Sequence, residues 1–595
     1  MSSRRSASAR RSARRSAPAS ASASVAVPAR ARGRLALAAA LLVVLALPGC
    51  AAASASAADR AEPANASGGE LIAEQACYDV EHYTLRLAVD PAEESIDGSL
   101  VMRARVTQPT TRIALDLDER LDVDGVRVNG EEVRTTHEDG RLWIALGRPR
   151  DVGETLRVEV AYGGTPRVAP RPPWDGGFTW ATTPEGGEPW ITTTCQGEGA
   201  DLWWPCKDHP SDKPDGVELF ITVPDGLVCA SNGTLRGTAA HDDGTRTFHW
   251  VVDDPISNYG VALNIGPYEL LEARHLSTSG DEIAVAFYHL PESRERAAAI
   301  LPQFVDHLAH MESVCGPYPF RGAKYGVVET PHLGMEHQTI IAYGNRFRPG
   351  THGDAYDWLH HHELSHEWWG NLVTCSDWRD MWIHEGIGTY MQALYLEQRF
   401  GPDAYRAEMR AKRRQLVNER AVAPRTVHDS RQIYFRPDGR FDNDIYSKGS
   451  WVVHSLRWLL GDETFFAVLR RWAYPTPEHE RATDGSQVRL VDTDELLAIA
   501  EATSGQELDW FFEVYLRQPV LPRLSGEQDE GVLSVRWEVP DGLPFPMPVP
   551  VEIDGDLVRV PVGGNGVGAF ALGRNATWVL DPGDLVLKEL AEDDG

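Results

Sequence analysis

A short motif in the middle of the chain has the residue types and the spacing of a metal site. It reads His362-Glu363-Leu364-Ser365-His366. In a helix, residues four apart lie one turn apart on the same face, so both imidazoles can reach one metal ion. Glu363 lies about a quarter-turn from His362, close enough to contact a water molecule on that ion without being a ligand. The motif therefore predicts a helical zinc site with Glu363 as the general base.

A third candidate ligand comes later in the chain. Eighteen residues separate His366 from Glu385. A catalytic zinc takes three protein ligands and keeps one position open, and two histidines with one glutamate form an established set. We therefore expect one Zn²⁺ per chain, bound by His362, His366 and Glu385. The neighbouring His360 and His361 are poorer candidates, because neither is followed by a histidine four residues later.

These segments resemble a known enzyme family. HELSHEWWGN (362–371) and WIHEGIGTY (382–390), at this separation, closely resemble the gluzincin aminopeptidases of the aminopeptidase N and leukotriene-hydrolase type. The family pattern is HExxH, eighteen residues, then Glu. The resemblance covers about residues 78–587, and it implies a zinc aminopeptidase with a thermolysin-like catalytic domain.

The resemblance also implies a substrate-binding strand. Gly334-Met335-Glu336-His337-Gln338 looks like the family's Gly-x-Met-Glu-Asn segment, in which the glutamate holds the free α-ammonium of the substrate. The chain departs from the pattern at two positions, with Leu333 in place of the leading glycine and His337 in place of the asparagine. Gln196 stands where the family places a glutamine or glutamate on a loop of the β domain, as a second anchor for that ammonium. The expected substrates are therefore peptides with a free N-terminus.

A tyrosine completes the expected catalytic set. Tyr446-Ser-Lys-Gly449 resembles the family's Tyr-x-Lys-Gly, where the tyrosine faces the zinc across the scissile bond. A phenol suits this position because it is a neutral hydrogen-bond donor at pH 7. Removing one such oxyanion donor typically lowers kcat by about 10²–10³. Tyr446 and Glu363 are thus the expected catalytic residues.

Two other interpretations of the zinc motif stay open at this point. The first is another zinc hydrolase on the same scaffold, either an endopeptidase or an epoxide hydrolase. The second is a catalytically inactive surface lipoprotein that binds peptides. The expected function is a zinc metallo-aminopeptidase that removes the N-terminal residue of a peptide.

Hydrophobic periodicity predicts an α+β multidomain fold. Apolar residues alternate with polar ones from about Glu70 to Tyr268, helical spacing dominates to about Leu516, and alternation returns after Pro522. The predicted domains are an N-terminal β-sheet domain (70–268), a mostly α, thermolysin-like zinc peptidase domain (269–521) and a small C-terminal β-sandwich (522–595).

The N-terminus has the features of an export signal. Arg30, Arg32 and Arg34 precede an apolar run of about 13 residues, which is too short to span a bilayer but suits a signal peptide. Leu47-Pro-Gly-Cys50 resembles a bacterial lipobox. We expect a lipoprotein signal peptide at residues 1–49, a lipid on Cys50 and a flexible tether at 50–69. The expected location is the periplasmic or cell-surface side of a membrane, with plain secretion as the second choice.

The charge of the mature chain excludes one class of partner. The formal net charge is −29, and without the nine arginines of residues 1–34 it becomes −38. A body this acidic is not expected to bind nucleic acid, whose phosphates require a cationic face.

Six cysteines follow Cys50. An even number outside the cytoplasm permits disulfides, but spacing alone does not give their pairing, and free buried thiols are equally compatible with the sequence.

Overall fold

The computed structural model describes residues 66–436, 438–573 and 575–589. The expected signal segment, Cys50 and the tether up to residue 65 lie outside the described residues. Across the described ranges, no helix is both long and apolar enough to cross a bilayer.

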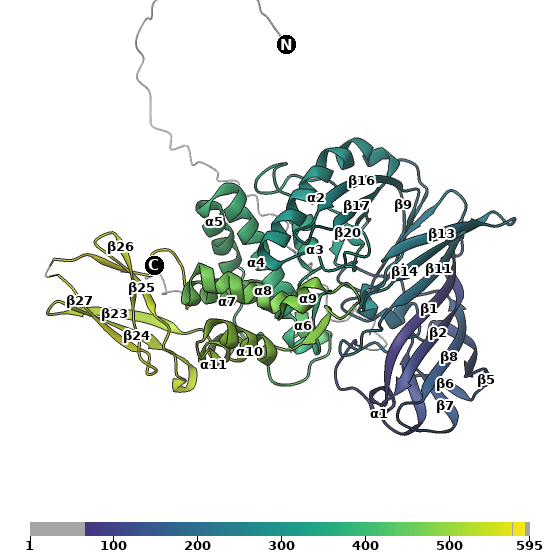
Figure 1. The fold of residues 1–595 in the computed structure, drawn as a ribbon, viewed down its shortest axis with the longest axis horizontal. Coiled ribbons are helices and arrows are strands. Elements are labelled where there is room, and N and C mark those ends of the chain that lie inside the picture. Colours follow the sequence, from purple (N-terminus) through teal and green to yellow (C-terminus); the bar gives the residue numbers. More distant parts are fainter. Residues whose placement is uncertain (1–65, 437, 574, 590–595) are drawn as a thin grey trace, which may run out of the picture. The chain divides into compact units, whose positions relative to one another are not determined.

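The first part of the chain is built from β-sheets (Figure 1). Tyr83, Leu85 and Leu87 alternate with more exposed residues along one strand and are buried, as a period of two requires. Asn129 and Gly130 both have positive φ, and they form a tight hairpin turn between β4 (Leu121–Val128) and β5 (Glu131–Glu132), as expected for an Asn-Gly pair. A one-turn helix, α1 (Ala73–Ala76), precedes the first strand.

The largest sheet of this region has eight strands. In spatial order they are β13 (Thr234–Ala240), β14 (Thr245–Val252), β11 (Val217–Pro224), β1 (Tyr78–Asp90), β2 (Ser95–Val106), β8 (Thr155–Gly164), β4 (Leu121–Val128) and β5 (Glu131–Glu132). A three-stranded sheet contains β3 (Thr110–Asp116), β7 (Arg141–Arg150) and β6 (Thr135–Glu138). A four-stranded sheet contains β12 (Val228–Ala230), β15 (Asn264–Gly266), β10 (Pro189–Thr194) and β9 (Gly177–Thr182).

The central part begins with a different sheet and continues as helices (Figure 1). Its five strands, in spatial order, are β16 (Glu269–Leu276), β17 (Glu282–His289), β18 (Tyr325–Glu329), β20 (Ile341–Tyr343) and β19 (Gly334–Met335). Two short strands, β21 (Val373–Cys375) and β22 (Arg489–Val491), pair in parallel.

Two helices of this part end at glycines. The long helix α2 ends before Gly316, which has a φ of 102°, and α7 ends before Gly461, which has a φ of 76°. Glycine adopts these positive φ values readily, whereas other residues rarely do. The helices are α2 (Arg294–Cys315), α3 (Trp358–Ser365), α4 (Trp382–Phe400), α5 (Pro402–Arg413), α6 (Arg431–Tyr434), α7 (Asp444–Leu460), α8 (Asp462–Ala473), α9 (Pro477–Arg481), α10 (Thr493–Ser504) and α11 (Asp509–Phe512).

The last part of the chain returns to strands, in two three-stranded sheets. One contains β23 (Arg523–Asp529), β24 (Val532–Glu538) and β27 (Val567–Ala571), and the other contains β26 (Asp556–Val560), β25 (Val549–Ile553) and β28 (Trp578–Leu580). Asp554 and Gly555, both with positive φ, form the turn between β25 and β26. The predicted order of β, then mostly α, then β is therefore confirmed.

The cysteines after Cys50 are all free, buried thiols in this structure. They are Cys77, Cys195, Cys206, Cys229, Cys315 and Cys375. The sequence left open whether these cysteines form disulfides or remain free, and in the structure they are free.

Candidate active site

Helix α3 places both motif histidines on one side. Its N-terminus is capped by the Asp357 side chain, which accepts a hydrogen bond from the backbone N–H of His360 at 3.0 Å. His362 lies in the last turn and His366 directly follows the helix, so the two rings project from neighbouring turns. Their Nε2 atoms are 3.3 Å apart.

Glu385, in the first turn of helix α4, meets both rings. Its Oε2 lies 3.4 Å from Nε2 of His362 and 3.5 Å from Nε2 of His366. Ligand bonds of about 2.0–2.2 Å around a tetrahedral zinc require ligand atoms to be about 3.4 Å apart. The three side chains therefore form a triangle of the right size for one zinc ion.

The chemistry of this triangle also fits a cation. Glu385 is 2% exposed, and its Oε2 has no hydrogen-bond partner among the described residues. A buried, unpartnered carboxylate oxygen is costly unless a cation compensates it. Burial lowers the pKa of His362 to about 3, so its ring is neutral and offers a lone pair. The Nδ1 of His366 lies 2.9 Å from the backbone oxygen of Trp369, which leaves Nε2 free to be a ligand.

Glycines bring the neighbouring helices close to α4. A Cβ on Gly386 would lie 2.8 Å from the Cα of Gly449 in α7, so the two backbones touch at this point. A Cβ on Gly388 would lie 2.8 Å from the hydroxyl of Ser365, at the end of α3. Larger residues at these positions would separate the helices that carry the site.

The contact between α4 and α7 positions the expected catalytic tyrosine. The Tyr446 hydroxyl donates a hydrogen bond to Oε1 of Glu385 at 2.8 Å. Burial raises the pKa of Tyr446 well above its usual value, and the nearby Glu385 carboxylate raises it further. The phenol is therefore a neutral donor beside the three candidate ligands.

The Glu363 carboxylate lies against strand β19. A Cβ on Gly334 would lie 2.2 Å from Oε1 of Glu363, so only glycine leaves room for this carboxylate. One oxygen each of Glu336 and Glu363 and a ring nitrogen of His366 lie within 4.8 Å of one another. Burial raises the pKa of Glu363 well above its usual value, and the charges of the two neighbouring glutamates add to this shift.

Glu336 directly follows β19 and is 3% exposed. Its Oε1 accepts hydrogen bonds from Nε2 of Gln196 and, at 3.1 Å, from the hydroxyl of Tyr259. Its backbone oxygen accepts one from Nδ2 of Asn371 at 3.0 Å. Met335, the residue before it, is buried. The structure thus brings Gln196, from the N-terminal β region, to the strand on which the sequence places the substrate anchor.

Tyr434, on helix α6, also reaches the site, although no sequence motif marks it. Its hydroxyl donates to Oε1 of Gln196 at 2.9 Å and lies 3.5 Å from Oε1 of Glu385. The amide of Gln196 is therefore held at both ends, with its NH₂ group toward Glu336 and its oxygen toward Tyr434. Neither Tyr434 nor Tyr259 could be singled out by spacing, because the contacting residues are far away in the sequence.

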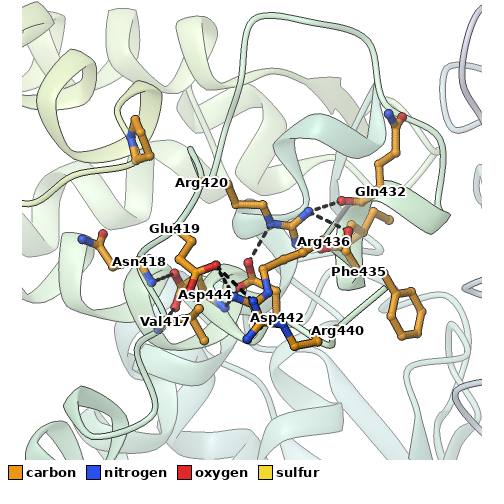
Figure 2. A network of polar contacts seen from close by, with 12 residues as sticks. Val417, Asn418, Glu419, Arg420, Gln432, Phe435, Arg436, Arg440, Asp442 and Asp444 are labelled. Atoms are coloured by element: carbon orange, nitrogen blue, oxygen red, sulfur yellow. Dashed lines mark hydrogen bonds and ion pairs between the residues drawn. The ribbon is translucent and has the colours of Figure 1, made fainter. Parts of the chain in front are cut away.

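An arginine fixes the short helix that carries Tyr434. Figure 2 shows the Arg420 guanidinium between the end of α6 and the residues before α7, where it donates to the backbone oxygens of Gln432 and Phe435. It also donates to the backbone oxygen of Ile433 and forms an ion pair with Asp442 at 2.8 Å. Carbonyls at a helix C-terminus need such donors. Arg420 therefore holds α6 in the orientation that presents Tyr434.

Two family profiles match this chain. The "Peptidase M1 N-terminal domain" matches residues 79–259, and the "Peptidase family M1 domain" matches residues 320–515. The second range contains the triangle and Tyr446. The chain belongs to peptidase family M1.

Individual M1 relatives agree with this assignment. Aminopeptidase M1-B of rice (Oryza sativa subsp. japonica) is 25% identical over 76% of this chain and 51% of its own length. Leucine aminopeptidase 2 of Pyricularia oryzae is 24% identical over 78% of this chain and 75% of its own length. The chain thus spans about half of the rice relative and three quarters of the fungal one.

Solved M1 structures have the same fold. An M1 zinc metallopeptidase mutant of Deinococcus radiodurans, bound to a Tyr-Ser-Ala substrate, is 25% identical, with a TM-score of 0.59 over 75% of this chain and 95% of that one. The M1 zinc metallopeptidase of the same organism gives a TM-score of 0.61 at 24% identity, over 77% and 96% of the two chains. The expectation of a zinc metallopeptidase with one catalytic zinc is therefore confirmed.

Replacing Tyr434 with phenylalanine tests its place in the site. Tyr434→Phe removes the hydrogen bond to Gln196 but keeps the ring, so we expect KM for a peptide substrate to rise about 3- to 10-fold, which corresponds to one hydrogen bond. We expect kcat and zinc content to change by less than about 2-fold. Steady-state kinetics and metal analysis measure these quantities.

The matched control is Tyr515→Phe, which removes a hydrogen bond to the backbone oxygen of Leu587. This control should lower thermal stability and leave KM unchanged. An unchanged KM in Tyr434→Phe would show that the hydroxyl does not support the substrate anchor.

Proposed function

We propose that this M1 peptidase is a zinc aminopeptidase that removes the N-terminal residue of peptides. His362, His366 and Glu385 would hold the zinc, which when bound supplies a Lewis acid and activates a water molecule near neutral pH. The side chain of His362 is 14% exposed, so the metal position is open to solvent on that side.

Glu363 and Tyr446 would carry out the proton transfer and the charge stabilisation. Glu363 accepts a proton from the attacking water at its carboxylate and delivers it to the departing amine. The carboxylate lies within 4.8 Å of both His366 and Glu336, so it is close to both the metal site and the substrate anchor. The Tyr446 hydroxyl, beside Glu385, donates a hydrogen bond to the oxygen that becomes negative as the peptide bond is attacked.

The observation that carries the aminopeptidase proposal is the state of Glu336. It is buried, and the hydrogen bonds that its carboxylate accepts among the described residues come from two neutral side chains, Gln196 and Tyr259. Gln196 and Tyr259 already donate to Oε1, which leaves Oε2 for a further donor. A substrate ammonium supplies both the missing charge and the missing donor, whereas the interior of a peptide chain supplies neither. This preference would restrict cleavage to the N-terminal residue.

The names of the relatives support the same activity. The rice and fungal proteins are called aminopeptidases, and the Deinococcus radiodurans peptidase was solved with a tripeptide substrate. Because the interior of a peptide carries no ammonium, a buried carboxylate without a cation at the position of Glu336 would give an endopeptidase no advantage in substrate binding.

A panel of aminoacyl anilides and peptides, each with a free or an acetylated N-terminus, tests this proposal. We expect acetylation to lower kcat/KM by at least about 100-fold, because it removes the cation that Glu336 binds. Glu363→Gln should keep one zinc per chain and lose about 10²–10⁴ in kcat. Product analysis by mass spectrometry identifies the bond that is cut.

The control variant is Glu295→Gln, which changes an exposed glutamate of helix α2 and should behave as the wild type. Cleavage of acetylated peptides at internal bonds would favour an endopeptidase. A zinc-loaded Glu363→Gln enzyme with near-normal turnover would rule out the proposed general base.

We also propose that the chain is exported and anchored to a membrane by a lipid on Cys50, with peptides outside the cytoplasm as its substrates. The support is the sequence around Cys50, with basic residues, a short apolar run and a lipobox-like end. We expect the expressed wild type to partition into the detergent phase and Cys50→Ser into the aqueous phase. A wild-type chain found only in the aqueous phase would favour plain secretion.

A further inference from the structure

The N-terminal β region contains a group of buried aspartates that takes no part in the proposed reaction. Asp116 ends strand β3, Asp118 follows it, Asp201 lies in a short 3₁₀ turn (Ala200–Leu202), and Asp208 follows that turn. All four are buried, with exposed fractions between 1% and 9%. Buried aspartates are rare unless they are paired, so each needs a partner.

Two of these aspartates are compensated. Asp116 accepts hydrogen bonds from Gln75 at 2.6 Å and from the backbone of Asp208 at 2.9 Å, and lies 3.4 Å from the guanidinium of Arg141. Asp118 forms an ion pair with Arg120 at 2.8 Å.

Asp201 is not compensated. It is 1% exposed, and neither of its carboxylate oxygens has a hydrogen-bond partner or an ion pair among the described residues. It faces a second carboxylate: a Cβ on Gly199 would lie 2.2 Å from Oδ1 of Asp201 and 2.4 Å from Oδ2 of Asp208. These two oxygens are therefore no more than about 4.6 Å apart, and Gly199, with a φ of 110°, leaves room for both carboxylates because it has no side chain.

Asp208 has polar contacts but no salt bridge. Its Oδ1 accepts a hydrogen bond from the backbone N–H of Ala200 at 3.1 Å. The nearest basic side chain along the chain, Lys207, is paired with Asp212 at 2.6 Å. The ring nitrogens of His209 are bonded to the Ser211 hydroxyl and a backbone oxygen.

With all four carboxylates ionised, this group of aspartates carries two more negative charges than its two arginines, Arg120 and Arg141, balance. Four carboxylates face two guanidinium groups, and the excess is located at Asp201 and Asp208. Burial, followed by the charge of Asp208, raises the pKa of Asp201, and burial raises the pKa of Asp208. Burial, followed by the charge of Asp208, also raises the pKa of Asp116 to about 7.

A hydrogen bond from Ser67, the N–H of Ala200 and the charge of His209 stabilise the Asp208 carboxylate in part, whereas neither oxygen of Asp201 has a hydrogen-bond partner among the described residues. A bound cation or a bound proton would relieve the remaining repulsion.

We propose that Asp201 and Asp208 bind a divalent cation of the calcium type. One such ion balances the excess charge of the group. The available donors are carboxylate oxygens, which hard cations prefer. Two carboxylates are too few for a zinc site with three protein ligands, but they suit calcium, which completes a flexible shell with backbone oxygens and water.

The site would support the loop that carries Gln196. The backbone oxygen of Cys195 accepts hydrogen bonds from the N–H groups of Glu198 and Gly199, at 3.2 and 2.8 Å, so the turn that begins at Gln196 leads directly to Asp201. A cation bound between Asp201 and Asp208 would remove their repulsion and so hold the end of this turn in place. A consequence for substrate binding rests on the proposed function, whereas cation binding itself does not.

Terbium luminescence tests the site directly, because Tb³⁺ replaces Ca²⁺ in oxygen sites and Trp203 and Trp204 follow Asp201. The full protein is stripped with EDTA and reloaded with one equivalent of zinc. We expect one Tb³⁺ per chain, excited through tryptophan and displaced by Ca²⁺ but not by equimolar Mg²⁺. We also expect Ca²⁺ to raise Tm by about 2–6 °C.

Two variants make the result specific. Asp201→Asn should bind Tb³⁺ and Ca²⁺ at least 10-fold more weakly, and without calcium it should melt no lower than the wild type, because it removes the repulsion. Asp122→Asn, which changes an exposed aspartate of β4, should match the wild type in both measurements. In the wild type, calcium should also lower KM for a free N-terminal substrate about 3-fold and leave kcat unchanged.

Other outcomes would overturn the proposal. A wild type with no Tb³⁺ signal and a calcium-independent Tm would mean that protons alone relieve the two aspartates. Equal binding by Asp201→Asn would place the ion elsewhere. Zinc content and anilide turnover would be normal in either case, so failure of this inference is distinguishable from failure of the proposed peptidase function.

Discussion

The site depends on the compensation of one buried carboxylate. Glu385 lies between two imidazoles, one of its oxygens accepts from Tyr446, and the other has no partner among the described residues. Burial raises its pKa, so the ionised form requires a cation. The separations of about 3.4 Å to the ring nitrogens set the size of the ion that fits, and zinc has that size. The close contact of helices α4 and α7 and the capped helix α3 hold these three side chains in place.

The need of a buried carboxylate for a cation also applies to the substrate anchor, Glu336, and to the buried aspartates of the N-terminal β region. Glu336 is a buried carboxylate that lacks a cation, and a substrate ammonium would supply one; Asp201 is another, and we propose a bound divalent ion for it. Gln196 connects the two, since it donates to Glu336 and its turn ends at Asp201. The N-terminal β region therefore contributes Gln196 and Tyr259 to the active site, and we propose that the charges of Asp201 and Asp208 influence the position of the loop that carries Gln196.

The sequence was sufficient to predict the elements that depend on local spacing. Histidines four residues apart share a helix face whatever the rest of the fold does, and the alternation of Leu533 and Val535 determines which side of a strand is buried. Contacts between distant segments left no such pattern. Tyr434 meets Gln196 across 238 residues, because Arg420 holds a one-turn helix that has no periodicity of its own. Asp201 looks like a loop residue in the sequence, and only the fold places it against Asp208.

Anomalous diffraction at the zinc absorption edge tests the central claim most directly. Crystals of the zinc-loaded protein should give one strong peak per chain, about 2.0–2.2 Å from Nε2 of His362, Nε2 of His366 and a carboxylate oxygen of Glu385. A peak at any other position, or a Glu385 carboxylate turned away from the ion, would contradict the assignment of these three residues as the zinc ligands.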